Sequence, residues 1–300
     1  MSLIPAAANL DFDPWLRLGA IVLRWEALAL ALVILVCLLL FGWSVRRTIH
    51  GVRTDDVVFV VLAALPGAVV GGRLVHGLDF LSAYSADPTA LLDLGRGSLS
   101  LVGAVAGGVL SGAYVCRLLG YAPGLWLDAA AESLLLAIGL GKLSMALGGA
   151  GQGAPDSGAF ATAYLGDGWV SANAAVPAYA SQVYEGLWVL LGASLLLLLT
   201  HAAAERWPGS GRRFLAAMCW WLSGRLLIGF TWRDDRAIGP FNAEQLATAA
   251  LLLFAVATLP LVSAVRSRRS GAATPATTEP PATPEPLAAE SAATPPAPGP

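Results

Sequence analysis

Six charged side chains lie within or beside apolar segments that are long enough to cross a bilayer. They are Arg24, Glu26, Arg73, Lys142, Glu185 and Arg225. An ionised group at membrane depth costs between about 2.5 and more than about 10 kcal/mol, so such residues are rarely accidental. When the chain is threaded across a membrane, all six fall in the same half. We expect them to line an enclosed polar chamber that opens to one leaflet.

The charges of these residues suggest what the chamber binds. Four are basic and two are acidic, so the chamber carries surplus positive charge if all six face inward. Lipid phosphate is the most abundant anion at that depth, and arginine binds it through two N–H groups while lysine acts as a point charge. The residues alone predict an anionic-phospholipid site facing the outer leaflet. Alternatively, Arg24 and Glu26 extend to the interface, and Arg73 and Arg225 hold helices together.

The composition indicates a polytopic membrane protein. The chain has 300 residues, of which 56% are hydrophobic and 13% charged, and its mean hydropathy is +0.67. A soluble domain carries about 25% charged residues. The cysteines and histidines lack the spacing of a metal site. We therefore expect no metal, no other cofactor and no nucleic-acid partner.

Seven stretches are long enough to span the membrane, since a helix needs about 20 apolar residues to do so. They are residues 19–43, 57–78, 98–118, 126–147, 182–203, 214–231 and 244–265. The N-terminus lacks the basic region of a cleaved signal peptide, so the first stretch should remain as a span. The predicted fold class is all-α, with seven transmembrane helices.

The loop charges predict the orientation. Ten arginines fall on one side of the threaded chain: Arg46, Arg47, Arg53, Arg117, Arg206, Arg212, Arg213, Arg266, Arg268 and Arg269. The positive-inside rule makes that side cytoplasmic, so the N-terminus is external and the C-terminus cytoplasmic.

This orientation divides the chain into three parts. Residues 1–18 form an external N-terminal segment, and residues 19–265 form the transmembrane domain, with a long external loop at 148–181. Residues 270–300 are mostly Pro, Ala, Thr and Glu. Such a segment cannot bury a core, so we expect a disordered cytoplasmic tail.

Four motifs resemble those of the prolipoprotein diacylglyceryl transferase family, over about residues 18 to 265. The most specific is ASQVYEGLWVLL, in which Ser181, Gln182, Tyr184 and Glu185 match the family's segment. The others are GGRLVHG from Gly71, GLGKLSMALGGAGQG from Gly139 and RLLIGFTWRDDRAIG from Arg225.

The resemblance implies an enzyme of the bacterial inner membrane. It moves a diacylglyceryl group from phosphatidylglycerol to the lipobox cysteine thiol of a preprolipoprotein, and glycerol phosphate leaves. Arg225 and Lys142 would neutralise the phosphate, and Glu26 or Glu185 would take the thiol proton. The residues implied to bind substrate are Arg73, Gln182, Tyr184 and Gly153.

Six positions depart from the family's pattern. They are Lys142 for arginine, Met145 for asparagine, Ala150 for glutamate, Val102 for histidine, Glu26 for tyrosine and Gly229 for glutamate. Lysine keeps the charge but not the two-pronged geometry, and Val102 cannot accept a proton. The alternative function is therefore a catalytically degenerate member that binds anionic lipid or lipoprotein precursor without turnover.

Overall fold

The computed structural model describes residues 8–80, 99–171, 175–202 and 211–272, together with Tyr84, Ser85, Thr89 and Gly299. The first seven residues of the predicted N-terminal segment lie outside the described residues. So do Arg206 and most of the predicted tail at 270–300, whose first three residues continue the last helix.

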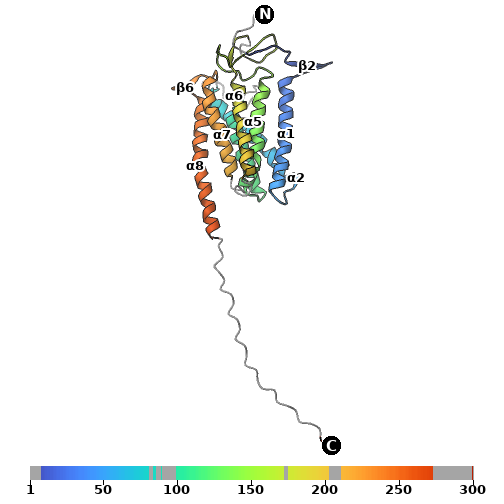
Figure 1. The fold of residues 1–300 in the computed structure, drawn as a ribbon, viewed down its shortest axis with the longest axis vertical. Coiled ribbons are helices and arrows are strands. Elements are labelled where there is room, and N and C mark those ends of the chain that lie inside the picture. Colours follow the sequence, from blue (N-terminus) through green and yellow to red (C-terminus); the bar gives the residue numbers. More distant parts are fainter. Residues whose placement is uncertain are drawn as a thin grey trace.

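Within these described residues, seven helices are long and apolar enough to cross a membrane, which confirms the predicted number of spans. They form one bundle (Figure 1). The helices are α1 (Trp25–Thr48), α2 (Thr54–Asp79), α4 (Leu101–Leu118), α5 (Pro123–Met145), α6 (Ser181–Ala202), α7 (Arg212–Ile228) and α8 (Ala243–Ala272).

The first helix begins later than the predicted 19–43 span. Residues Trp15–Leu18 (β2) and Ile21–Arg24 (β3) pair as an antiparallel hairpin before it. A two-residue turn joins them, and Gly19 in that turn has a positive φ of 61°, which suits a tight hairpin. Arg24 is consequently the residue that precedes α1, and Glu26 lies in the first helical turn.

The all-α prediction also missed a small cap of short strands. β4 (Ala161–Tyr164) pairs in parallel with β1 (Ala8–Leu10) and antiparallel with β5 (Ala178–Tyr179). β6 (Arg236–Ile238) and β7 (Phe241–Asn242) form a second hairpin. All four residues of β4 are buried, so the predicted loop at 148–181 contains ordered structure. We call the bundle end that carries this cap the loop end, and the opposite end the tail end (Figure 1).

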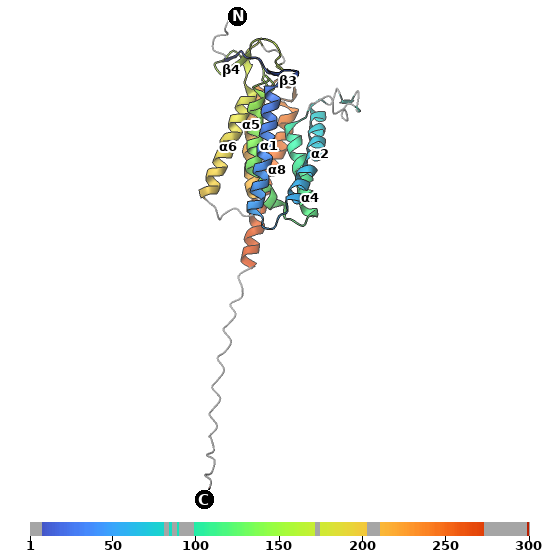
Figure 2. The ribbon, with the colours of Figure 1, turned by 90° about the vertical axis from the view of Figure 1, so that its right-hand side faces the viewer.

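The helices differ in how much of their surface is inside the bundle. α5 and α7 are the most buried, and α5 packs against α1, α6 and α7. α2 and α4 lie side by side on one flank, as Figure 2 shows. Large apolar side chains such as Leu39, Leu198 and Leu253 remain exposed. On membrane-length helices, these side chains provide the surface that contacts lipid.

Glycines let α2 and α4 approach closely. A Cβ atom on Gly107 of α4 would lie 2.1 Å from the carbonyl oxygen of Gly67 in α2. Helices in lipid associate through this kind of backbone contact because no hydrophobic effect drives them together. The pair α2–α4 therefore depends on small residues at this crossing.

Gly107→Ala should lower the thermal unfolding temperature of the purified protein, because overpacking at a close contact costs about 1–3 kcal/mol. Gly112→Ala is the matched control on the same helix, since a Cβ there meets its nearest atoms at 3.7 Å. It should be neutral or stabilising, because alanine favours helix by up to about 1 kcal/mol over glycine. Equal shifts for the two variants would contradict the proposed close packing.

Candidate functional site

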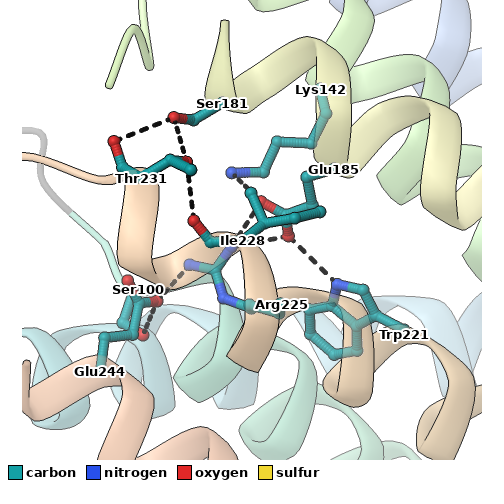
Figure 3. A network of polar contacts seen from close by, with 9 residues as sticks. All are labelled: Ser100, Lys142, Ser181, Glu185, Trp221, Arg225, Ile228, Thr231 and Glu244. Carbon is teal, nitrogen blue, oxygen red and sulfur yellow. Dashed lines mark hydrogen bonds and ion pairs between the residues drawn. The ribbon is translucent and has the colours of Figure 1, made fainter. Parts of the chain in front are cut away.

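The carboxylate of Glu185 is the centre of a buried polar network at the loop end (Figure 3). Glu185 lies near the start of α6 and is 0% exposed. Its Oε2 atom is 3.0 Å from Lys142 Nζ on α5. Arg225 Nη1 on α7 donates to both carboxylate oxygens, at 2.7 and 2.8 Å, and Trp221 Nε1 donates to Oε1 at 3.3 Å. Both oxygens of Glu185 are thus occupied by donors.

The network continues from Arg225 to two further helices. Arg225 Nη2 donates to Glu244 Oε1 in the first turn of α8. The hydroxyl of Ser100 donates to the same oxygen at 3.1 Å, and it also caps α4 by accepting from Gly103 N at 3.3 Å. The five helices α4, α5, α6, α7 and α8 therefore contribute to, or begin at, one connected set of charges, part of which Figure 3 shows.

A pair of tryptophans sets the register between α6 and α7. The rings of Trp188 and Trp220 stack with centroids 4.7 Å apart, and each indole N–H donates to the other's carbonyl at 2.9 Å. A Cβ on Gly224 would lie 2.1 Å from the Trp188 ring, so the ring requires glycine there. Because Trp188 is near Glu185 and Gly224 precedes Arg225, this contact holds the two charges opposite each other.

An aromatic ring covers the two cations. Trp232 follows the short helix η3 (Gly229–Thr231), and its ring centroid is 4.5 Å from Lys142 Nζ and 5.8 Å from Arg225 Cζ. Both distances suit cation–π attraction. Thr231 is fixed to the start of α6 by a 2.7 Å contact between its hydroxyl and that of Ser181.

A narrow pocket adjoins this network. It is lined by Arg225, Gly229, Trp232, Asp234, Asn242, Glu244, Gln245 and Thr248. The side chain of Glu244 is 22% exposed, whereas that of Glu185 is 0% exposed. Glu244 is therefore the carboxylate of the network that reaches the pocket.

Glu26 belongs to a second cluster. It lies 3.5 Å from Arg24, and Arg24 Nη2 donates to the carbonyl of Gly148 at 2.9 Å. The guanidinium of Arg24 lies over the ring of Trp15, 5.2 Å from its centroid. The sequence thus predicted correctly that Arg24 and Glu26 lie at the same end of the bundle as the Glu185 network. In the structure, however, this pair contacts the cap.

Three of the predicted substrate-binding residues make hydrogen bonds with the cap, two of them from α6. Gln182 Nε2 donates to Tyr164 OH at 3.0 Å, and Tyr184 OH donates to the Phe160 carbonyl at 2.6 Å. The N–H of Gly153 donates to the Tyr179 carbonyl at 2.7 Å. In the structure they hold the cap over the network.

Arg73, the fourth, is buried on α2. The carbonyl of the neighbouring Gly72 accepts a hydrogen bond from Ser100 N at 3.0 Å. Because Ser100 also holds Glu244, this hydrogen bond joins the segment of α2 that carries Arg73 to the edge of the network.

The prediction that four basic and two acidic residues line the chamber did not include Glu244. With Glu244 included, the two cations Lys142 and Arg225 meet two carboxylates, so the inner network is balanced. Ser100, Trp221 and Trp232 were also missed. Glu244 could have been found, because it opens the last apolar stretch at the same end as the other charges.

A bundle of membrane-length helices with a buried charge network at one end defines a polytopic membrane protein that can hold a charged group within the apolar zone. The model of the prolipoprotein diacylglyceryl transferase family matches residues 14–261. The chain therefore belongs to this family, as the sequence motifs indicated.

Relatives with the name phosphatidylglycerol–prolipoprotein diacylglyceryl transferase cover most of the chain. The one from Limosilactobacillus reuteri is 25% identical over 244 residues, which is 79% of this chain and 86% of the relative. The one from Lactiplantibacillus plantarum is 27% identical over 244 residues, 80% of each chain. The one from Dehalococcoides mccartyi is 26% identical over 251 residues, 83% of this chain and 92% of the relative.

Glu185→Gln should lower the thermal unfolding temperature strongly. Removing one partner of a buried pair costs about 3–5 kcal/mol, and here Lys142 loses its counter-ion while Arg225 loses one of its two. Glu132→Gln is the matched control, because Glu132 pairs with Arg213 at the tail end with both side chains about one-fifth exposed. A partly exposed pair contributes about 0–1 kcal/mol. A larger shift for Glu132→Gln would contradict the central role of Glu185.

Proposed function

We propose that this protein transfers a diacylglyceryl group from phosphatidylglycerol to the lipobox cysteine thiol of preprolipoproteins. Family membership over residues 14–261 and the names of the relatives support this function. The observation that carries it is the meeting of Lys142 and Arg225, from two different helices, on the buried carboxylate of Glu185. Two fixed cations, of which Arg225 lines the adjoining pocket, suit the phosphate of an anionic lipid.

We also propose that the loop end faces outward from a bacterial inner membrane, with the N-terminus external and the C-terminus cytoplasmic. The arginines at the tail end support this orientation through the positive-inside rule. Those among the described helices and their flanks are Arg46, Arg47, Arg53, Arg117, Arg212, Arg213, Arg266, Arg268 and Arg269. Phosphatidylglycerol would then enter from the outer leaflet.

The proposed reaction requires stabilisation of a developing negative charge. The thiol sulfur bonds to the terminal glyceryl carbon, the bond from that carbon to the phosphate oxygen breaks, and glycerol phosphate leaves. Lys142 and Arg225 neutralise the charge that grows on the phosphate. Arg73 binds the remainder of the head group, while Gln182 and Tyr184, with Gly153, keep the cap closed over the reactants.

Glu185 and Glu26 were the two carboxylates proposed to take the thiol proton. Both oxygens of Glu185 are held by Lys142 and Arg225, and the side chain does not reach the pocket. We therefore assign Glu185 the role of orienting the two cations. Glu26 pairs with Arg24 beneath Gly148, so we assign it to the cap.

The alternative is a degenerate family member that binds lipid or precursor without turnover. The relatives found are named as transferases, which gives this alternative no support. The deciding experiment is transfer of labelled lipid to a lipobox peptide in membranes, together with complementation of a strain depleted of its own transferase. Rescue and label transfer would establish the activity, and failure of both would exclude it.

Arg225→Ala should reduce label transfer by about 10²–10³-fold, because it removes one donor to the developing charge. It also leaves Glu185 and Glu244 with one cation fewer. Arg24→Ala is the comparison, since Arg24 lies outside the Glu185 network, and its loss should cost much less. Equal losses, measured as initial rates in the same membranes, would contradict this geometry.

Lys142→Arg should preserve or raise the transfer rate, because a guanidinium can bind phosphate through two N–H groups. The measurement is the initial rate of label transfer with phosphatidylglycerol vesicles as donor. A complete loss would instead show that Glu185 and Trp232 have packed around a lysine, and that the ammonium at this position is required.

A further inference from the structure

Glu244 differs from the other carboxylates of the site in its surroundings. It lines the pocket, whereas Glu185 is sealed between Lys142 and Arg225. Its Oε1 accepts one N–H of Arg225 and the hydroxyl of Ser100. It therefore contacts the proposed phosphate-binding cation and the space beside it at the same time.

We propose that Glu244 is the catalytic residue that takes the thiol proton, and that arriving phosphate releases it from Arg225. This role rests on the proposed transferase function. The guanidinium of Arg225 holds Glu185 through Nη1 and Glu244 through Nη2. Because Nη1 is fixed on a fully buried partner, the phosphate competes with Glu244 for Nη2.

Glu244 becomes a stronger base when phosphate displaces it from Arg225. A carboxylate that has lost its cation and is shielded from water accepts a proton more readily. Ser100 keeps the displaced carboxylate in place, because its hydroxyl is anchored at the capped N-terminus of α4. Binding of the lipid donor thus activates the base next to the reacting centre, before the peptide thiol is used.

The proposed transfer is a nucleophilic displacement at the terminal glyceryl carbon of the lipid. The S–H bond breaks and the proton moves to a Glu244 oxygen, while the sulfur electron pair forms the new S–C bond. The C–O bond to the phosphate breaks, and its electron pair leaves with glycerol phosphate. Protonated Glu244 no longer attracts Arg225, so the guanidinium stays with the more highly charged product. When that product departs, Glu244 loses the proton to water and the ion pair with Arg225 re-forms.

The test compares a cysteine lipobox peptide with the same peptide carrying selenocysteine, in membranes containing labelled phosphatidylglycerol. A selenol is a stronger acid than a thiol and is already ionised at neutral pH, so it needs no base. Glu244→Gln should lower transfer to the cysteine peptide by about 10²–10⁴-fold, the usual contribution of a general base. Transfer to the selenocysteine peptide should fall far less.

Three variants make the result specific. Glu244→Asp keeps a carboxylate and should retain part of the cysteine activity. Asp234→Asn removes the other carboxylate that lines the pocket and should not show the selenocysteine-selective recovery. Glu132→Gln, at the tail end, is the control for an acid-to-amide change and should leave both rates unchanged.

Any other result would contradict the assignment of Glu244 as the base. If Glu244→Gln loses both activities equally, Glu244 only positions Arg225, and if it loses neither, Glu244 is not the base. Selective recovery in Asp234→Asn instead would move the role to Asp234. Phosphatidylglycerol binding to Glu244→Gln should be unchanged or tighter, and weaker binding would contradict the exchange at Arg225. An unaltered protein that transfers to neither peptide would refute the transferase function itself.

Discussion

The site depends on one constraint, which is that the carboxylate of Glu185 must balance two cations where water is excluded. Moving an ion into such a place costs several kcal/mol even after relaxation, and only close opposite charges with full hydrogen bonding offset that cost. Glu185 meets this requirement with Lys142, Arg225 and Trp221 as donors. The helices that supply those donors, α5 and α7, are also the most buried in the bundle.

The direction of each helix matches the sign of the charge that it carries at the loop end. α1, α6 and α8 begin there and carry Glu26, Glu185 and Glu244, whereas α2, α5 and α7 end there and carry Arg73, Lys142 and Arg225. Acids are favoured at helix N-termini and bases at C-termini. Alternating spans therefore bring both signs together at one depth. The backbone assists the four charges that lie in a terminal turn, which are Glu26, Glu244, Lys142 and Arg225.

The sequence predicted the parts of the structure that depend on local patterns. Seven apolar stretches predicted seven helices, and alternation of the spans placed Lys142, Glu185 and Arg225 at one end. The cap was missed because its strands are only two to four residues long and pair with strands far away in the sequence, as Ala8 does with Thr162. Glu244 was missed because it opens an apolar stretch, where a charge is usually solvated. Its place at the same end as Lys142, Glu185 and Arg225 was the available signal, and the contact with Arg225 identifies its role.

The same contact explains one departure from the family's pattern. Where the motif has a glutamate one turn after Arg225, this chain has Gly229, and a Cβ there would lie 2.6 Å from Gln245 Cγ. Gln245 occupies that space and donates to the Leu226 carbonyl at 3.0 Å. Its neighbour Glu244 then presents a carboxylate to Arg225 from α8. In this chain, the second carboxylate that pairs with Arg225 therefore comes from α8 and not from the turn that follows Arg225.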